Sequence, residues 1–361
     1  MNREKHRSKW PSPIPLALEA MTLVSVSVVS RIDLYLNLLR KGNSMSATNG
    51  PVLISDPLPP ATEEILRNAG LDVIVGADKV EESLASISGW ILRSGTQITA
   101  DLLEQAPHLR CICRAGAGVD NIDCDAAAAK GVLVMNTPAA NSNAAAEHAL
   151  ALMFAVARNV GQGHLGMSQG GWDRKTLVGV ELEGKTLVVV GMGKIGQRVC
   201  RKAQGLGMNV LGCDPFVEAA VCEANGATLS SLEDALPNAD FISLHPPLND
   251  HTRGMVNDDF LGQCKEGVRI VNVSRGPVID SEALLRAVNS GQVAAAGLDV
   301  FVEEPPSEDD PLRHHASIIC TPHLGASTVE AQDNVGLQSA QQVAAFLLEG
   351  QVQHPVNEPV N

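Results

Sequence analysis

Apolar residues in this chain of 361 residues occur in short runs that alternate with longer amphipathic stretches. From residue 51 onward the runs fall at 52–55, 72–75, 90–93, 110–114, 132–135, 186–190, 209–212, 241–244, 268–273, 293–300 and 317–321. Short runs rich in β-branched residues are typical of buried parallel strands, and the stretches between them have helical periodicity. The alternation predicts an α/β protein with two doubly wound, parallel-sheet domains.

Two helical stretches are unusually long. Residues 143–161 are rich in alanine and exceed the length of a simple crossover, so we expect this helix to lead from the first domain into the second. The last stretch, residues 328–348, follows Ser327 with Glu330 three positions later, which is the pattern of a capping box. We expect this helix to return to the first domain. The predicted division is a first domain of residues 51–142 completed by 327–361, with a second domain of residues 143–326 inserted in it.

Residues 1–50 do not follow this pattern. A basic start at residues 1–9 precedes an apolar stretch at 14–30 that Glu19 interrupts. The stretch resembles a poor signal peptide without a clear cleavage site, and it is too broken for a transmembrane helix. We therefore expect an extension without regular structure, or a start assigned too early, with Met45 beginning the functional chain.

The segment from Lys185 to Asp214 joins a strand, a glycine-rich turn, a helix, a second strand and an acid. Gly191 permits the tight turn, Gly193 allows a pyrophosphate to approach, and Gly196 lets the helix pack on the strand. The start of the helix offers unpaired N–H groups to phosphates. Asp214, 23 residues after Gly191, can accept hydrogen bonds from both ribose hydroxyls and repels a 2′-phosphate. A glycine-rich turn without function is the alternative, but the complete set predicts an NAD site.

Charge and cysteine content exclude several other classes of protein. The chain has 27 Lys and Arg against 41 Asp and Glu, a net charge of −14, which argues against a broad nucleic-acid or anionic-membrane surface. The eight cysteines show neither CxxC pairs nor zinc spacing, so we expect buried, reduced thiols in a cytoplasmic protein and no metal site.

Chemistry in parallel α/β proteins lies at the carboxyl ends of the strands, in the cleft between domains. Three predicted strands of the second domain are followed there by Arg275, Glu304 and His323. An imidazole can take a hydroxyl proton while hydride leaves for a nicotinamide, and a carboxylate beside it favours the imidazolium form and fixes its tautomer. A guanidinium can hold a substrate carboxylate with two parallel hydrogen bonds. The three together suit hydride transfer at a 2-hydroxy acid.

Each of these residues also has a purely structural interpretation. Glu303 and Glu304 could form a solvated acidic loop, His323 could cap a helix, and Arg275 could make a surface ion pair. Any one of them alone would favour that simpler interpretation, and the functional prediction depends on the combination.

The motifs above, together with further segments of the chain, resemble a known family, the D-isomer-specific 2-hydroxyacid dehydrogenases. The segments that carry the resemblance are RSGTQIT at Arg93, RAGAGVDNID at Arg114, GVLVMNTPAANSNAAAEHALALM, GMGKIG, VNVSRG, GLDVFVEEPP and TPHLGAST. The resemblance covers the chain from about Val52 to the end, over 300 residues, with its segments in the family's order. Two positions depart from the pattern, because Ala117 replaces a threonine of close relatives and Pro246 replaces a hydroxyl residue on the adenine side.

The resemblance implies roles for particular residues. Arg275, Glu304 and His323 become the catalytic set, with Glu304 chosen over Glu303 by its spacing from the aspartate of LDVF. The implied NAD contacts are Gly191, Gly193, Lys194, Ile195, Gly196, Asp214, Pro246, Val273, Ser274, Asp299, Gly325 and Ala326. The implied substrate contacts are Arg93, Ser94, Gly95, Arg114, Ala115, Gly116, Arg275 and His323.

The resemblance also implies an activity. Around Arg93 the chain is most similar to the members that oxidise D-3-phosphoglycerate to 3-phosphohydroxypyruvate, the first step of serine synthesis. A reductase for hydroxypyruvate, glyoxylate or another D-2-hydroxy acid pair is an alternative, and an NAD-sensing corepressor of the same fold is a remote one. We expect a homodimer formed by the nucleotide-binding domains. We also expect a short form, without the regulatory domains that longer members carry beyond this point.

Overall fold

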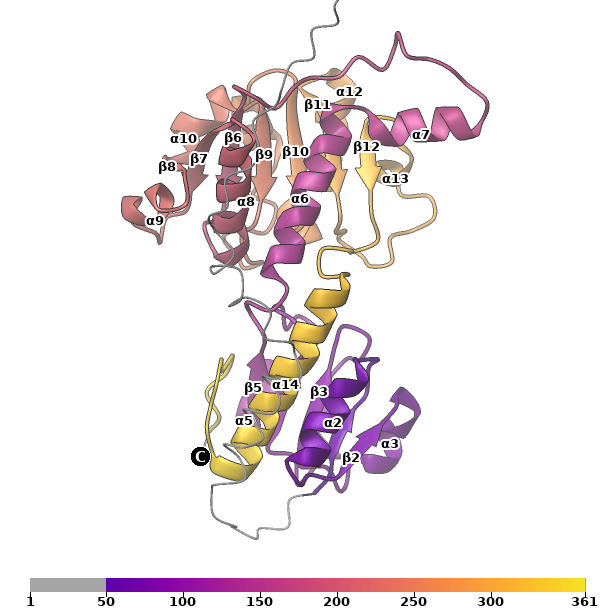
Figure 1. Ribbon diagram of the computed structural model, residues 1–361, viewed down its shortest axis with the longest axis vertical. Coiled ribbons are helices and arrows are strands. Elements are labelled where there is room, and N and C mark those ends of the chain that lie inside the picture. Colours follow the sequence, from indigo (N-terminus) through magenta and orange to yellow (C-terminus); the bar gives the residue numbers. More distant parts are fainter. Residues whose placement is uncertain (1–49, 361) are drawn as a thin grey trace, which may run out of the picture.

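The computed structural model describes residues 50–360, so the predictions about residues 1–49 and the start at Met45 lie outside the described residues. The described chain forms two α/β units, one above the other in Figure 1, and each is built on a fully parallel sheet. The predicted fold class is confirmed. Each predicted apolar run is a strand, with ends within two residues of those expected.

The first unit contains a five-stranded sheet in the order β2-β1-β3-β4-β5, which is the flavodoxin-like arrangement. Its strands are β1 (Val52–Ile54), β2 (Val73–Val75), β3 (Gly89–Leu92), β4 (Cys111–Arg114) and β5 (Leu133–Asn136). Its helices in this part of the chain are α2 (Pro60–Asn68), the 3-10 turn η1 (Ala77–Lys79), α3 (Val80–Ser83), α4 (Ala100–Glu104) and α5 (Cys124–Ala129).

The second unit contains a seven-stranded sheet in the order β12-β11-β10-β9-β6-β7-β8. This is the Rossmann order with one further strand, β12, at the edge. The strands are β6 (Thr186–Val190), β7 (Asn209–Cys213), β8 (Thr228–Leu229), β9 (Phe241–Leu244), β10 (Val268–Asn272), β11 (Val293–Leu298) and β12 (Ile318–Cys320). The helices are α8 (Lys194–Gly205), α9 (Ala219–Glu223), α10 (Leu232–Ala235), η2 (Leu236–Asn238), α11 (Asp258–Gln263), η3 (Gly276–Val278), α12 (Ser281–Ser290) and α13 (Pro311–His314). The short strand β8 was not predicted.

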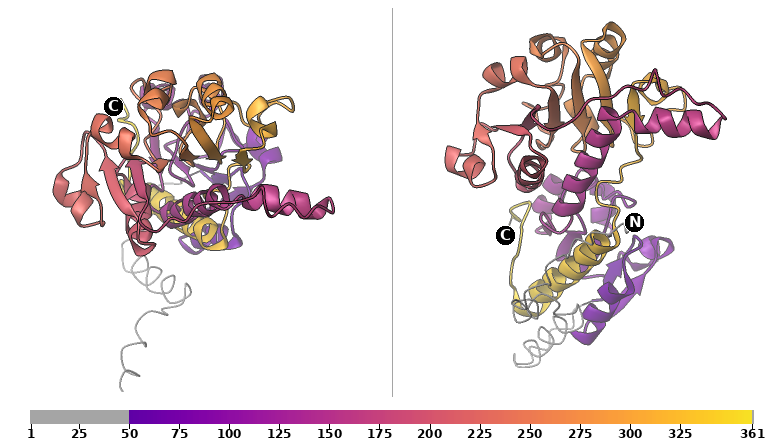
Figure 2. Two further views of the ribbon diagram at one scale, coloured as in Figure 1. Left: turned by 90° about the horizontal axis from the view of Figure 1, so that it is seen from above. Right: turned by 45° about the horizontal axis from the view of Figure 1, so that its top comes forward.

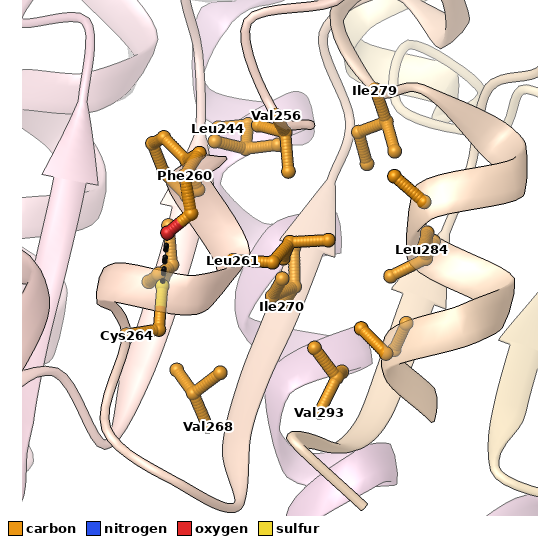
Figure 3. Packing of buried hydrophobic residues seen from close by; sticks show 14 of the residues in the cluster. Leu244, Val256, Phe260, Leu261, Cys264, Val268, Ile270, Ile279, Leu284 and Val293 are labelled. Atoms are coloured by element: carbon orange, nitrogen blue, oxygen red, sulfur yellow. Dashed lines mark hydrogen bonds between the residues drawn. The ribbon is translucent and has the colours of Figure 1, made fainter. Parts of the chain in front are cut away.

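Aliphatic side chains fill the space between the sheet and the helices. On one face of the second sheet, Ile270 and Val293 pack against Leu261 of α11 and Leu284 of α12 (Figure 3). On the other face, α6 lies so close to β11 that a Cβ at Gly297 would come within 3.0 Å of the Leu152 side chain. The burial of such residues drives the packing of both layers.

The helix predicted over residues 143–161 is two helices, α6 (Ser142–Ala157) and α7 (Val160–Ser168). The break falls at Asn159, whose φ of 53° is left-handed and incompatible with a continuous α-helix. After it, α7 extends away from the body of the second unit, and the chain returns along it (Figures 1 and 2). The single-helix prediction is wrong because the alanine-rich pattern gives no signal for this turn.

The last helix, α14 (Val329–Glu349), returns to the first unit as predicted and packs against α2 and β4. Its cap is Thr328, whose hydroxyl accepts the Ala331 N–H at 3.1 Å, so the capping box predicted at Ser327 is one residue too early. The chain after α14 then lies beside β5, where the Asn357 side chain accepts from the Val134 N–H and donates to the Val132 carbonyl. The first sheet is therefore completed by the end of the described chain.

The eight cysteines are free thiols, and six of them are buried. Burial raises the pKa of Cys111 and Cys264 to about 12, so these side chains behave as small apolar groups. Within residues 50–360 no three side chains are arranged to hold a metal ion. None of the described helices is both long enough and apolar enough to cross a bilayer.

Candidate active site in the cleft between the two units

A cavity of about 440 Å³ lies between the two units, and residues of both line it. It brings together all nine residues predicted for catalysis and substrate binding. They are Arg93, Ser94, Gly95, Arg114, Ala115, Gly116, Arg275, Glu304 and His323, together with the predicted cofactor contacts Ile195, Val273, Gly325 and Ala326. A second cavity of about 450 Å³ lies behind the loop of residues 300–312 and contains none of the predicted site residues.

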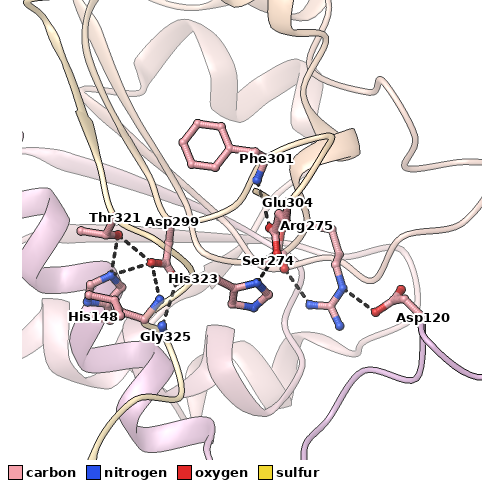
Figure 4. Close-up of polar contacts among 11 residues, drawn as sticks. Asp120, His148, Ser274, Arg275, Asp299, Phe301, Glu304, Thr321, His323 and Gly325 are labelled. Atoms are coloured by element: carbon pink, nitrogen blue, oxygen red, sulfur yellow. Dashed lines mark hydrogen bonds and ion pairs between the residues drawn. The ribbon is translucent and has the colours of Figure 1, made fainter. Parts of the chain in front are cut away.

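His323 and Glu304 form a hydrogen-bonded pair. The Nδ1 atom of His323 lies 2.6 Å from Oε2 of Glu304, and the Phe301 N–H donates to the other carboxylate oxygen at 3.1 Å (Figure 4). Burial raises the pKa of Glu304, but the bonds from His323 and Phe301 and the charge of Arg275 outweigh it and hold this pKa below its ordinary value. An ionised Glu304 assigns the proton to Nδ1 and leaves Nε2 as the proton acceptor.

Arg275 follows β10, and its guanidinium has two partners. Its Nε donates to Oδ2 of Asp120 at 2.9 Å, and its Nη1 donates to the Ser274 carbonyl at 2.7 Å (Figure 4). Gly118 lies directly against the guanidinium, because a Cβ at that position would overlap Nη2. The arginine is thus held in the cavity wall with N–H groups to spare for a ligand.

Asp299, predicted as an NAD contact, lies beneath the turn that carries His323 and is fully buried. Its carboxylate accepts four hydrogen bonds, from His148 Nε2 at 3.0 Å, Thr321 Oγ1 at 2.6 Å, and the N–H groups of Leu324 at 2.7 Å and Gly325 at 2.8 Å (Figure 4). Burial raises the pKa of Asp299, but the bonds from His148 and Thr321 outweigh it and hold this pKa below its ordinary value. In this arrangement Asp299 fixes the His323 turn, and its contact with NAD stays a prediction.

The loop that carries Arg93 is hydrogen-bonded to Asp56, which lies just after β1. Asp56 accepts the N–H groups of Arg93 at 2.5 Å and Thr96 at 3.2 Å, as well as the Thr96 hydroxyl at 3.0 Å. From the other side, Asn121 donates to the carbonyls of Arg93 at 2.7 Å and Thr96 at 2.6 Å. The lone pairs of Asp56 are therefore occupied by the loop, and the Arg93 side chain is presented to the cavity.

Arg114, at the end of β4, is a partly buried cation. Its Nε has no hydrogen-bond partner, and its side chain makes no ion pair with any described residue. Burial, together with the nearby charges of Arg275 and Arg93, lowers the pKa of Arg114 to about 10. Three guanidinium groups thus converge on one cavity, which makes it a site for an anion.

The turn after β6 fits a dinucleotide. Gly191 has a φ of 91°, and a Cβ there would lie 2.7 Å from the backbone of Pro246, so only glycine suits this position. A Cβ at Gly196 would overlap the Gly191 carbonyl, which explains how closely α8 packs on the turn. At Gly193, by contrast, nothing lies within 4 Å of the place that a Cβ would take, and the first turn of α8 has no side-chain cap. The three glycines therefore have the predicted geometry of a pyrophosphate cradle.

Asp214 directly follows β7 and lies beside this cradle. Its carboxylate accepts the Met192 N–H at 2.8 Å and the Phe216 N–H at 2.9 Å, which fixes its direction. Pro246 lies across the turn from Gly191, next to His245. Burial lowers the pKa of His245 to about 3, and its Nδ1 has no partner within the described structure. Asp214 and Pro246 thus lie beside the glycine turn, and their contacts with ribose and adenine stay predictions. Eight of the predicted NAD contacts lie outside the cleft cavity itself, namely Gly191, Gly193, Lys194, Gly196, Asp214, Pro246, Ser274 and Asp299.

Three residues of the site were missed by the sequence argument. Asp56 stands directly at the end of the first strand, and an acid at that place was a usable signal. Asp120 and His148 lie inside family segments, but their partners Arg275 and Asp299 are more than a hundred residues away in the chain. No pattern within a single segment could have paired them.

Known proteins give an independent comparison. Residues 150–325 match the family model described as the D-isomer specific 2-hydroxyacid dehydrogenase, NAD binding domain. The D-3-phosphoglycerate dehydrogenase of Rattus norvegicus is 45% identical over 295 residues, covering 81% of this chain and 55% of the relative. The chain thus spans about half the length of the curated relatives it matches.

This chain aligns with nearly the full length of several solved structures that have the same arrangement of two units. The TT0316 protein of Thermus thermophilus superimposes with a TM-score of 0.77 at 32% identity, over 85% of this chain and 99% of that one. A glyoxylate reductase from Paecilomyes thermophila gives a TM-score of 0.78 at 29% identity, over 86% of this chain and 99% of that one. Both units described above therefore occur together in known proteins.

Proposed function

This chain belongs to the D-isomer-specific 2-hydroxyacid dehydrogenase family, and from that premise we propose that it oxidises D-3-phosphoglycerate to 3-phosphohydroxypyruvate with NAD, the first step of serine synthesis. The relatives that bear the name D-3-phosphoglycerate dehydrogenase support the choice of substrate. The observation that carries the proposal is the partly buried Arg114 side chain, whose Nε has no acceptor in the described structure and which lines one cavity with Arg93 and Arg275.

The residues of the cleft divide the chemistry between them. Arg275 binds the substrate carboxylate through its free N–H groups, and His323 Nε2 takes the proton of the C2 hydroxyl. Glu304, bonded to Nδ1, stabilises the imidazolium that forms. NAD, when bound, supplies the acceptor for the hydride that leaves C2. In the reverse direction His323 returns the proton to the carbonyl oxygen.

The phosphate requires cations of its own. The substrate carries about three negative charges near neutral pH, because the second phosphate pKa is close to 6. Arg275 is committed to the carboxylate, so the phosphate falls to Arg93 and Arg114 on the first unit. Backbone N–H groups of the Ser94–Gly95 turn can add donors. A phosphate there offsets the cost of holding Arg114 in a partly buried position without an anion.

Substitution of Arg93 tests this assignment. Arg93→Ala should lower kcat/KM for D-3-phosphoglycerate by about ten- to a hundredfold, since a charge-assisted hydrogen bond is worth roughly 1.5–3 kcal/mol. Unphosphorylated D-glycerate should be affected far less. Arg67→Ala is the matched control, because Arg67 lies on α2 of the same unit and pairs with Glu63 outside the cavity. Equal losses for both substrates would show that Arg93 does not bind phosphate.

A reductase for hydroxypyruvate, glyoxylate or a related D-2-hydroxy acid pair is the second candidate. The similarity to a glyoxylate reductase structure favours it, as does Ala117, which removes a hydroxyl from the cavity wall. A wild-type preference for D-glycerate over D-3-phosphoglycerate would establish this candidate in place of the first. Turnover of any of these acids would exclude a role limited to NAD sensing.

We also infer a homodimer and a cytosolic location. The arm formed by α7 and the chain that follows it exposes Leu165, Met167 and Trp172, the last with 75% of its surface accessible. An apolar arm that extends from the nucleotide-binding unit suits a second copy of that unit. Leu165→Glu should shift the protein toward monomers in analytical ultracentrifugation, and an unchanged mass would count against this interface. The free cysteines support a reducing compartment.

A further inference from the structure

Asp120 and Arg275 belong to different units and meet across the cleft. Asp120 follows β4 of the first unit, and Arg275 follows β10 of the second. The Asp120 carboxylate takes the Nε proton at 2.9 Å, and the Ser274 carbonyl takes a proton of Nη1 at 2.7 Å. The guanidinium is therefore held from both sides of the cleft, once by its own unit and once by the facing unit.

The two bonds leave one edge of the guanidinium free. Asp120 uses a single oxygen on Nε and Ser274 uses one N–H of Nη1, so Nη2 and the second N–H of Nη1 remain. That edge can bind a carboxylate with two parallel hydrogen bonds. Arg275 lines the cavity whereas Asp120 does not, and in Figure 4 the guanidinium lies between His323 and Asp120. Asp120 thus sits behind the arginine and does not occupy the place of the substrate.

The position of Asp120 is tied to the substrate loop of the first unit. The neighbouring Asn121 donates to the carbonyls of Arg93 and Thr96, so the backbone at Asp120 is anchored to the loop that presents Arg93. A rotation of the first unit away from the second carries Asp120 with it and removes it from the reach of Arg275. The pair therefore depends on the angle between the two units.

We propose that Asp120 is a positioning residue that orients the Arg275 guanidinium for the substrate carboxylate and makes this orientation depend on closure of the cleft. The proposal rests on the proposed role of Arg275 in the dehydrogenase reaction and holds for any 2-hydroxy acid. In the open protein Arg275 keeps only the Ser274 bond and is free to rotate. Closure brings Asp120 to Nε and turns the free edge toward the cavity.

Removal of the Asp120 charge tests the proposal in the full chain. Asp120→Asn should raise KM for the 2-hydroxy acid by about three- to tenfold, with a smaller change in kcat and no change in NAD affinity measured by calorimetry. Asp120→Glu should restore most of the loss. Asp125→Asn is the matched control, because it removes an exposed charge of the same segment that makes no ion pair with any described residue.

A double-mutant cycle separates orientation from a general effect on the cleft. Lysine has no planar fork to orient, so in an Arg275→Lys background Asp120→Asn should cost nothing further. A full additional loss in that background, or a KM that is unchanged or lowered in Asp120→Asn alone, would overturn the role of Asp120. Wild-type turnover of 2-hydroxy acids distinguishes this failure from failure of the proposed function, since absence of any turnover would overturn both.

Discussion

The two walls of the cleft handle their charges in opposite ways. On the wall from the second unit, His323 is bonded to Glu304, and the buried Asp299 accepts four hydrogen bonds. On the wall from the first unit, the guanidinium groups of Arg93 and Arg114 have no acceptor among the described residues. The acid–base pair and Asp299 on the wall of the second unit are hydrogen-bonded without a ligand, whereas Arg93 and Arg114 on the wall of the first unit are not.

This difference separates the chemistry from the choice of substrate. A preorganised acid–base pair costs no rearrangement when the proton moves, and that is the requirement for rapid turnover. Arg114, in contrast, is a partly buried cation whose desolvation cost an anionic ligand relieves. We therefore expect the wall of the first unit to select which acid binds and the wall of the second unit to carry out the reaction.

The largest effect on turnover is expected when the acid–base pair of the second unit is removed. His323→Ala should lower turnover by about a thousandfold because the imidazole moves the proton in the transition state, while NAD affinity should persist. Single-turnover kinetics and calorimetric NAD binding measure the two properties. His108→Ala, an exposed histidine of the first unit, is the control. Loss of NAD binding together with activity would mean that His323 maintains the fold of the turn and not only the chemistry.

Asp214 belongs to the second unit, which also provides His323 and Glu304, and lies on its cofactor side. A carboxylate facing the 2′-position should give about a hundredfold preference for NAD over NADP through like-charge repulsion. Asp214→Ala should reduce that preference toward unity, mainly by improving kcat/KM with NADP. Comparable efficiency of the wild-type protein with both cofactors would contradict the assignment.

On the wall of the first unit, Arg114→Met should change affinity and stability in opposite directions. Loss of the cation should lower kcat/KM for D-3-phosphoglycerate by about tenfold. Removal of a partly buried, unpaired charge should also raise the free energy of unfolding by about 1 kcal/mol. Thermal unfolding with and without substrate measures both effects, and substrate should raise Tm in the wild-type protein more than in the variant. A lower Tm in Arg114→Met would mean that the arginine is already satisfied in the free protein.

The smallest effect concerns acid stability. Because the pKa of Asp299 is held below its ordinary value of 3.8, its stabilising contribution is complete above that pH and is lost as the pH falls through the lowered pKa. Asp299→Asn should unfold more easily than wild type near pH 6, and up to about 1 kcal/mol of that difference should vanish below pH 4. Tm measured between pH 6 and 3 tests this. A constant difference over the whole range would assign the effect to packing.

The sequence predicted those parts of the molecule that depend on neighbours in the chain. The strands, the glycine turn at Gly191 and the strand-end residues Arg275, Glu304 and His323 all follow from local pattern and spacing. The break at Asn159 was not predictable, because a left-handed residue between two helices leaves the alanine-rich pattern intact. The capping box at Ser327 was misplaced because Thr328 offers an equally good hydroxyl one residue later.

Contacts between distant segments were beyond the reach of such patterns. The pairing of Asp120 with Arg275 depends on the angle between two units, and that of His148 with Asp299 depends on how α6 lies along β11. Neither is encoded in the periodicity of one element. The resemblance to a family named the segments that contain Asp120 and His148 but assigned no role to either residue.

The order in which the elements occur along the chain has a consequence for synthesis on the ribosome. The apolar face of the first sheet is covered by α14, which is translated only after the whole second unit. The second unit is continuous in the chain and can fold as soon as it emerges from the ribosome. Ile54, Ile91 and Cys113 of the first sheet, in contrast, stay exposed until Val343 and Leu347 of α14 are synthesised and pack against them. During synthesis the nascent chain therefore exposes the apolar face of the first sheet next to a folded second unit. Exposed apolar surface promotes aggregation, so this is the interval in which the chain most needs a chaperone.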